Sequence, residues 1–375
     1  MPIFHIATGL LWLFVAARFL LPLPLHPGLR VVFGVLLLIA SQHHFLTRYF
    51  RGTSFSPEVP RPIGMMANVL FGTLLLLFVF QISLDGLFVV VSMFKGSCTD
   101  APATFRYAIG LAALGLSILG VVQAVRVPPV KEVEIRLPNL PPEFEGYRLI
   151  QLTDLHLSRL FPRRWAQGVV ERANAQNADL IVITGDLLDG SMEARRDDIE
   201  PLRALHAPDG VHVITGNHEY YFGHEAWMQH YISLGMNRLS NSHTRIARGD
   251  ANLVVAGLTD SASARFDLPR PDLRRALEGV PQGAPVILLD HQPRGARRAA
   301  EAGVDLQLSG HTHGGMILGM HRIVARFNDG FVSGLYRVGK MQLYVNNGTA
   351  LWNGFALRIG VPSELTVITL RRGTP

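Results

Sequence analysis

Histidine, aspartate and asparagine side chains gather in a few short stretches of this sequence, and most of these stretches contain glycine and follow an apolar run. In chain order they read Asp154-Leu-His156, Gly185-Asp186-Leu-Leu-Asp189, Gly216-Asn217-His218-Glu219, a single His291, and Gly310-His311-Thr-His313. One pair of histidines is a weak signal for a metal site, but five stretches in series are a strong one. Mixed nitrogen and oxygen donors suit Mn, Fe or Zn better than Ca. The pattern therefore predicts a site for such metals.

The donor set also indicates what a metal site would do. Two metal ions about 3.5–4 Å apart clamp the attacking and leaving oxygens of a phosphoryl displacement and generate hydroxide. Such a pair needs a carboxylate that bridges both ions, with imidazoles and oxygen donors around it. The single cysteine, Cys98, excludes a site rich in thiolates. No H-x-H-x-D-H run occurs, which argues against a metallo-β-lactamase-like hydrolase.

Strand-like and helix-like segments alternate from Tyr147 onward, and they must position these side chains. Side chains beyond the carboxyl ends of strands in an α/β sheet converge on one site. Apolar strands point to an α/β fold with a buried sheet. We expect strands at 147–154, 178–186, 210–217, 252–260, 285–290 and 304–310, with shorter ones around 323–327, 342–345 and 365–370. We expect helices at 163–177, 197–205, 224–234, 271–277 and 294–302.

With these elements in place, the chain resembles the calcineurin-like metallophosphoesterase superfamily, and within it the membrane-associated bacterial branch. The family pattern is D-x-H, G-D-x-x-D, G-N-H-[DE], a lone histidine and G-H-x-H, and every part is present in order. The resemblance implies a four-layer α/β/β/α metallophosphoesterase domain. It also implies that two divalent metal ions, most plausibly Mn, Fe or Zn, are the cofactors.

The same resemblance implies a role for each position. One ion would be bound by Asp154, His156 and His313, and the other by Asn217, His291 and His311. Asp186 would bridge the two ions. His218 would contact the phosphate and protonate the leaving oxygen as a general acid. Asp189 and Glu219 would orient loops or histidines.

Each position also has an ordinary structural interpretation. A lone histidine such as His291 is more often a surface residue or a satisfied core residue, and Asp189 alone would serve to cap the segment that follows. The preceding strands and the order of the stretches favour the functional interpretation for the seven ligands and for His218. The remaining histidines of this part match no stretch and receive no role: His206, His212, His224, His230, His243 and His321.

The first third of the chain predicts a multi-span α-helical membrane anchor. Apolar stretches near 3–21, 29–46, 63–93 and 105–125 are each of the length, about 20 residues, that crosses a bilayer. A cleaved signal peptide would explain only the first of them. We therefore expect a transmembrane region at 1–127 and a Pro-rich linker at 128–146 with an edge strand at Lys131–Leu137. The metallophosphoesterase domain would then span 147–375.

Charge is distributed unevenly between these parts. Residues 1–127 hold eight Lys or Arg against three acids, whereas the rest holds 27 basic and 26 acidic residues. The balanced second part indicates no nucleic-acid partner. Four spans place the loop 47–62 and the C-terminal part on the same side, together with Arg48, Arg51, Arg61 and Arg126. The positive-inside rule then predicts a bacterial inner (cell) membrane protein with a cytoplasmic catalytic domain.

Several polar residues lie within or near the predicted spans. The sequence shows no repeated pattern among His43, His44, Gln81 and Asp85. We interpret them as interface positions or interhelical hydrogen bonds rather than as a transport path. Arg18 would extend its guanidinium toward the interface.

Together these features predict a membrane-anchored hydrolase of a phosphodiester or pyrophosphate bond. An apolar anchor favours a substrate at the bilayer surface, and the branch that the chain resembles includes enzymes that cleave the pyrophosphate of a UDP-linked diacylglucosamine. The expected partners are the membrane and a phosphorylated small-molecule or lipid-linked substrate, including a nucleotide-sugar-lipid. Two alternatives stay open: a phosphodiesterase on soluble substrates, and a catalytically silent membrane regulator. The second predicts lost ligands, and none of the seven is missing.

Overall fold

A computed structural model describes residues 2–47, 53 and 56–374. The chain forms two compact units, which we call the helical unit and the sheet unit. The helical unit consists of Met1–Ala124 and Asn353–Ile359, and the sheet unit of Val125–Trp352 and Gly360–Pro375. The late segment 353–359 was expected to lie in the metallophosphoesterase domain, yet it packs with the helices. The domain limits at residues 127 and 146 stay predictions.

The helical unit contains four long apolar helices. They are α1 (Pro2–Val15, continued by a π-helical turn at Ala16–Leu20), α2 (Pro27–Thr47), α3 (Arg61–Lys95) and α4 (Ala103–Val125). Each is long and apolar enough to cross a membrane. The four predicted spans are therefore confirmed in length and composition. Two residues of the predicted topology signal, Arg48 and Arg51, lie outside the described part of the chain.

Segment 353–359 is held in the helical unit by hydrogen bonds to α3 and α4. The Asn68 amide donates to the Asn353 carbonyl at 3.3 Å and accepts from the Ala356 N–H at 2.6 Å. The Arg358 N–H donates to the Gly120 carbonyl at 3.1 Å. Gly120 allows this approach, because a Cβ there would overlap the side chain of Leu357. The chain thus leaves the sheet unit for seven residues and then returns to it.

The sheet unit contains two six-stranded sheets. The first has the order β1 (Val130–Leu137), β12 (Leu365–Arg372), β2 (Arg148–Leu152), β3 (Leu180–Ile183), β4 (Val211–Val213) and β5 (Asn237–Arg238). The second has the order β10 (Gly334–Val338), β11 (Met341–Val345), β9 (Leu306–Ser309), β8 (Val286–Leu289), β7 (Ala251–Gly257) and β6 (Ser242–Arg248). Strands β2 to β5 run parallel, as do β7, β8, β9 and β11. The predicted edge strand near Lys131 is confirmed as β1.

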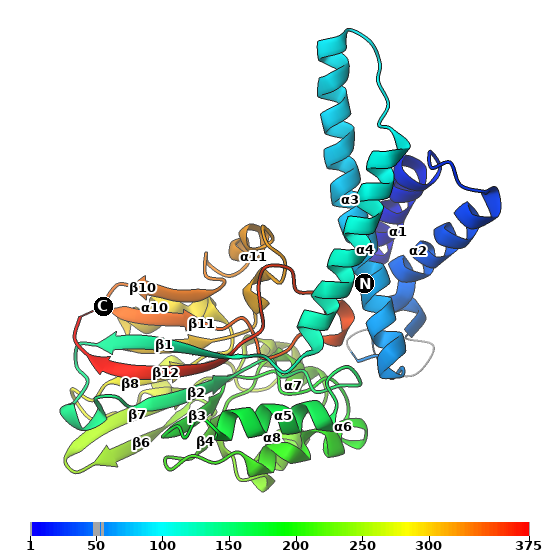
Figure 1. The fold of residues 1–375 in the computed structure, drawn as a ribbon. Helices are drawn as coiled ribbons and strands as arrows, with labels where there is room; N and C mark the ends of the chain where they lie inside the picture. Colours follow the sequence, from blue (N-terminus) through cyan, green and yellow to red (C-terminus); the bar gives the residue numbers. More distant parts are fainter. Residues whose placement is uncertain (1, 48–52, 54–55, 375) are drawn as a thin grey trace. The chain divides into compact units, whose positions relative to one another are not determined.

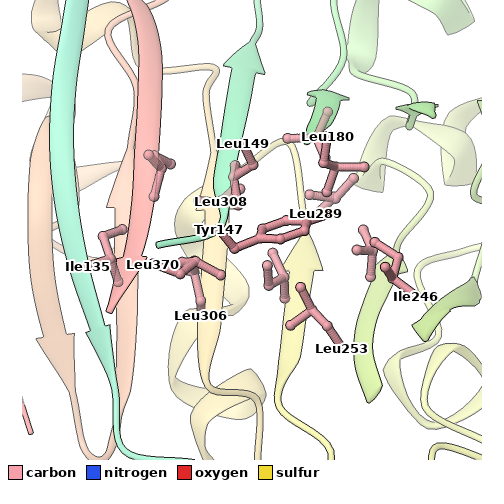
Figure 2. Close-up of a cluster of buried hydrophobic side chains, with 14 of the residues drawn as sticks. Ile135, Tyr147, Leu149, Leu180, Ile246, Leu253, Leu289, Leu306, Leu308 and Leu370 are labelled. Carbon is pink, nitrogen blue, oxygen red and sulfur yellow. The ribbon is translucent and has the colours of Figure 1, made fainter. Parts of the chain in front are cut away.

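The two sheets pack face to face through one apolar core. Figure 2 shows Leu149 and Leu370 of the first sheet near Leu308 and Leu306 of the second, within one cluster of buried side chains. Strand residues alternate between this core and the outer faces, because successive side chains point to opposite sides of a sheet. The central strands are nevertheless buried on both faces, which explains their continuous apolar runs.

Helices cover the outer face of each sheet. In Figure 1, α5 (Arg163–Asn174), α6 (Met192–Ile199) and α8 (His224–Ser233) lie along the strands β2 to β4. On the other side, α9 (Leu273–Ala276) and α10 (Ala296–Glu301) pack on the second sheet through a separate apolar cluster. The expected four-layer α/β/β/α architecture is therefore observed.

One predicted element is wrong in type. Residues 323–327 were expected to form a strand, but they belong to α11 (His321–Arg326) and its C-cap Phe327. The apolar residues Ile323, Val324 and Phe327 fit one helical face as well as a short strand, because they are spaced by one and three positions. No residue of α11 is buried. Packing against a core, which usually decides between a helix and a strand, therefore does not act on this segment.

Candidate metal centre

The carboxyl ends of β2, β3, β8 and β9 bring six of the seven predicted ligands together. Their ligand atoms form two groups, each within 4.8 Å. One group contains Asp154, His156 and His313, and the other contains Asp186, His291 and His311. The sides of the centre thus come from both sheets rather than from one.

Asp186 lies between the two groups. Its Oδ2 is 3.2 Å from His291 Nε2 and 3.8 Å from His156 Nε2. It is 2 % exposed, so solvent contributes little to its surroundings. One carboxylate therefore faces ligands of both groups, which is the position that a bridging ligand occupies.

Asn217, the seventh predicted ligand, is the first residue of α7 (Asn217–Tyr221) and is buried. Its Oδ1 has no hydrogen-bond partner among the described residues. The next residue, His218, donates its backbone N–H to Asp186 Oδ1 at 2.8 Å. This bond fixes the start of α7 against Asp186. A buried amide oxygen without a partner is unfavourable unless something binds it.

Hydrogen bonds orient two of the imidazoles through Nδ1. His291 Nδ1 lies 2.7 Å from the carbonyl of Thr184, to which its N–H donates. His156 Nδ1–H donates to Asp189 Oδ1 at 3.0 Å. In both rings Nε2 is then left for the centre, and His156 Nε2 is buried with no hydrogen-bond partner among the described residues. This arrangement is typical of metal-binding histidines.

The backbone of the ligand loops is unusual. Ten described residues other than glycine have positive φ, and five of them are predicted ligands. These are Asp154 (51°), His156 (42°), Asp186 (55°), His311 (68°) and His313 (50°). Residues with a side chain rarely adopt this region, and such residues cluster at functional sites. Sequence reasoning had no signal for it.

Two glycines are required by the carboxylates. A Cβ at Gly216 would overlap Asp186 Oδ1, and a Cβ at Gly310 would overlap Asp154 Oδ2. Both glycines therefore let the backbone of one strand end lie against the carboxylate of another. The glycines in these stretches thus serve the packing of the ligands themselves.

Asp189 and Glu219 support the predicted ligands without belonging to the two groups. Asp189 Oδ1 accepts from His156 and also from His218 Nδ1 at 2.5 Å. His218 Nε2 then lies 3.9 Å from Asp186 Oδ2. Burial opposes a charge on His218, but Asp186 and Asp189 raise its pKa above the ordinary value. Glu219 accepts from the backbone N–H groups of three residues in two ligand-bearing turns: Asp186, Leu187 and Gly216.

No ligand was predicted from the sequence in one wall of the centre, the loop that follows β11. Thr349 N–H donates to the Thr153 carbonyl at 2.8 Å, and Ala350 N–H to the Asp154 carbonyl at 2.9 Å. A Cβ at Gly348 would lie 2.8 Å from His313 Nδ1. The available signal was the polar stretch Asn346–Thr349 directly after an apolar strand, the same pattern that marks the other ligand loops.

The residues present fit two metal ions. Asp154 and Asp186 are buried, and the described residues give neither a Lys or Arg partner; their charged neighbours are histidines. Burial penalises the carboxylates, yet these histidines hold the pKa of both below the ordinary value. Burial opposes a charge on His156, but Asp189, together with Asp154 and Asp186, raises its pKa to about 10. The centre therefore attracts positive charge, which bound metal ions supply in exchange for the protons.

Distances agree with this interpretation. Ligand atoms lie 3.6 Å apart between His313 Nε2 and Asp154 Oδ1, and 3.3 Å apart between His311 Nδ1 and His291 Nε2. Atoms that surround one ion with bonds of about 2.0–2.2 Å are separated by roughly 3–3.5 Å. Small adjustments of the side chains would complete both shells.

Comparison with known proteins bears on the same residues. A family model described as calcineurin-like phosphoesterase matches residues 147–315, which include all seven predicted ligands and His218. A transmembrane protein with metallophosphoesterase domain from Danio rerio is 36% identical over 266 residues, which cover 68% of this chain and 60% of that protein. An uncharacterized metallophosphoesterase from Campylobacter jejuni is 33% identical over 269 residues, 71% of this chain and 70% of that protein.

A solved structure, a putative 5'-nucleotidase from Staphylococcus aureus, is similar at a TM-score of 0.41 and 13% identity, covering 55% of this chain and 49% of that one. The chain matches about three fifths of the length of the Danio rerio relative.

The fold and the ligand set agree with the family model. The chain belongs to the calcineurin-like metallophosphoesterase family. Relatives from Danio rerio and Bos taurus are named transmembrane proteins, and this chain has four helices that are long and apolar enough to cross a membrane.

Proposed function

We propose that this protein is a membrane-anchored dinuclear-metal phosphohydrolase that cleaves a phosphodiester or pyrophosphate bond in a lipid-linked or nucleotide-sugar-lipid substrate. One observation carries the proposal: the Asp186 carboxylate faces ligands of both groups, at 3.2 Å from His291 and 3.8 Å from His156. A carboxylate in this position suits a pair of ions and the in-line displacement at phosphorus that such pairs catalyse.

Bound metal ions, for which Mn, Fe or Zn fit the nitrogen and oxygen donors, would supply positive charge and an activated water for a displacement at phosphorus. Asp154, His156 and His313 would hold one ion, and Asn217, His291 and His311 the other. Asp186 would be the ligand that the two ions share.

His218 delivers the proton that the leaving oxygen requires. Its Nδ1 is held by Asp189 Oδ1 at 2.5 Å, so the ring cannot rotate, and Nε2 faces the centre. A proton on Nε2 is then available to the departing alkoxide or phosphate oxygen. Positioned acids of this kind contribute about 10²–10⁴-fold to rate.

The membrane anchor supports a substrate that is itself in the bilayer. Four helices of the same chain are able to cross a membrane, which concentrates the catalytic residues near lipids. Loop 47–62 and the residue after α4 hold Arg48, Arg51, Arg61 and Arg126, more cations than the other side holds. We therefore place the sheet unit in the cytoplasm and the helices in the inner membrane of a bacterium.

The test uses the full chain in detergent with Mn²⁺ and three substrates. These are bis-p-nitrophenyl phosphate, a UDP-linked diacylglucosamine and its deacylated form. We expect turnover of all three, with kcat/KM for the acylated substrate more than about tenfold higher than for the deacylated one, because acyl chains add apolar burial. Asp186→Ala should abolish all three activities.

Each other result has a defined meaning. Equal kcat/KM for the acylated and deacylated substrates would support a phosphodiesterase acting on soluble substrates. If the wild type binds two metal ions and hydrolyses none of the three substrates, the silent-regulator alternative replaces the enzyme.

A further inference from the structure

The segment Met316–Phe327, which includes α11, extends from the metal centre into solvent. It begins three residues after the predicted ligand His313 and contains the helix in which no residue is buried. Leu318 is 73 % exposed, Ile323 56 % and Phe327 64 %. Figure 1 shows α11 standing apart from the two sheets of its unit. We call residues 316–327 the apolar projection.

The apolar projection is ordered at its base rather than frayed. Thr312 donates its hydroxyl to the Val332 carbonyl, at 2.6 Å, across the two ends of the projection. Asn328, which follows it, donates to the Val324 carbonyl at 3.0 Å. Ile317 pairs with Gly360 in an isolated antiparallel bridge. These contacts order the backbone of the projection while its large apolar side chains point into solvent. Exposed apolar side chains on an ordered segment are typical of a surface that binds a membrane or another molecule.

The charged residues of the apolar projection are all cations. Residues 306–328 contain no Asp or Glu, whereas Arg322 and Arg326 lie on α11 and are exposed. Arg294, from the loop after β8, donates to the Phe327 carbonyl at 2.6 Å and adds a third cation at the end of α11. Cations therefore accompany the exposed apolar side chains of the projection, and the nearest acid after it along the chain is Asp329.

The combination of apolar side chains and cations suits the surface of a bilayer with anionic lipids. Apolar side chains enter the boundary between head groups and acyl chains, while Arg side chains pair with lipid phosphates. The chain carries its own spans, so a bilayer is always within its reach. Gly360, paired with Ile317, directly follows the last residue of the segment held by the spanning helices. The base of the apolar projection is therefore paired with the residue at which the chain leaves the helical unit.

We propose that the apolar projection inserts into the anionic head-group region of the bilayer and holds the rim of the metal centre on the membrane surface. A phosphate linked to a lipid then reaches His313 and its neighbours without leaving the bilayer. The benefit of insertion for catalysis rests on the proposed function, but insertion itself is measurable without any substrate. Insertion would give a role to residues 316–327, which follow the last ligand loop.

The experiment measures the depth of a fluorophore in proteoliposomes. The full chain carries Cys98→Ser, which removes the exposed native thiol, and Ile323→Cys labelled with an environment-sensitive dye. The matched control carries Asp250→Cys, in the exposed turn between β6 and β7. That turn precedes β7, and therefore lies at the opposite edge of the sheet from the carboxyl ends that hold the ligands.

In vesicles that contain phosphatidylglycerol, we expect spin-labelled lipids to quench the dye at position 323 and aqueous iodide to leave it unaffected, with the reverse at position 250. The insertion should reach about 5–10 Å below the head groups. The arginines are then replaced by Arg322→Gln and Arg326→Gln. The ratio of lipid-quenched to iodide-quenched dye at position 323, which reports inserted against free projection, should fall about fivefold for each arginine removed. Phosphatidylcholine vesicles should give the same low ratio.

Two results overturn the proposal. One is iodide quenching at position 323 equal to that at position 250. The other is protection at 323 from iodide and from spin-labelled lipids together, which would mean that a second copy or another protein covers the segment. Because no turnover is measured, failure here leaves the proposed hydrolase activity intact. Insertion without hydrolysis would contradict the proposed function alone.

Discussion

Carboxylates in the two units are compensated in different ways. In the helical unit, Asp85 accepts two hydrogen bonds from the Arg18 guanidinium, at 3.0 and 3.1 Å, and one from Gln81 at 2.7 Å. In the metal centre, the described residues give Asp154 and Asp186 no Lys or Arg partner. Asp85 pairs with an arginine, which keeps its charge, whereas Asp154 and Asp186 face histidines, which bind either protons or metal ions.

The difference explains which region needs a ligand. A buried carboxylate is costly unless a cation and hydrogen bonds compensate it. Arg18, Gln81 and Asp85 complete such a set among themselves and stabilise the packing of α1 and α3. The metal centre has no permanent cation of this kind among the described residues, and its histidines are able to exchange protons for divalent ions. Removing a carboxylate should therefore affect metal binding and hydrolysis in the metal centre, and stability alone in the helical unit.

The largest effect is expected from Asp186→Asn in the metal centre. Hydrolysis of bis-p-nitrophenyl phosphate should fall more than about 10³-fold, because both ions lose the shared ligand. The metal-free protein should unfold at a lower temperature at neutral pH, because neighbouring histidines hold the pKa of Asp186 below its ordinary value in the folded state and the change removes that attraction. A metal-free form as stable as wild type would show that these histidines do not compensate Asp186.

His218→Gln should lower kcat by about 10²–10⁴-fold for a substrate with a poor leaving group. The loss should be much smaller for p-nitrophenolate, which departs without a proton. Metal content, measured by elemental analysis, should equal that of wild type. A variant that loses an ion would instead make His218 a ligand.

Chelation should destabilise the sheet unit and leave the helical unit unchanged. With metal at about 100 times its dissociation constant, binding adds about 2.7 kcal/mol to the free energy of unfolding. Thermal unfolding of the full chain, followed by tryptophan fluorescence with and without EDTA, measures the shift. The shift caused by EDTA should be much smaller in Asp186→Asn. An equal shift in the two proteins would contradict the claim that Asp186 binds the metal ions.

Asp85→Asn should have the smallest effect, and on stability only. The Arg18 side chain is 52% exposed, so the loss should be about 1 kcal/mol or less in detergent. Phosphoester hydrolysis should equal that of wild type. A loss of hydrolysis would mean that this charge pair is coupled to the metal centre.

The metal centre was predictable because its chemistry dictates residue types at strand ends. Asp154, Asp186 and His311 each stand two or three positions after the last apolar residue of a strand, and the turns need glycine where a carboxylate lies against the backbone. The positive φ of five ligand residues was not predictable, because neighbouring strand ends impose it rather than the local sequence.

The polar set of the helical unit was predicted only in part. Gln81 and Asp85 were expected to make interhelical hydrogen bonds, and Asp85 does so with Arg18. Arg18 was expected to extend toward the interface, but it binds Asp85 through two nitrogens. Isolated polar residues in apolar helices carry no spacing that identifies the partner.

Two other features escaped prediction for the same reason. Segment 353–359 is held by Asn68 and Gly120, more than 230 positions earlier in the chain. The helix α11 buries nothing, so neither its type nor its role follows from core packing. Long-range and external contacts leave no periodic pattern in the residues that make them.

Metal stoichiometry tests the central claim most directly. The full chain, purified with Mn²⁺ and freed of excess metal, is analysed for bound ions together with Asp186→Asn and Asp85→Asn. We predict two ions per chain in the wild type and in Asp85→Asn, and one or none in Asp186→Asn. Fewer than two ions in saturated wild type, or two in Asp186→Asn, would contradict a centre bridged by Asp186.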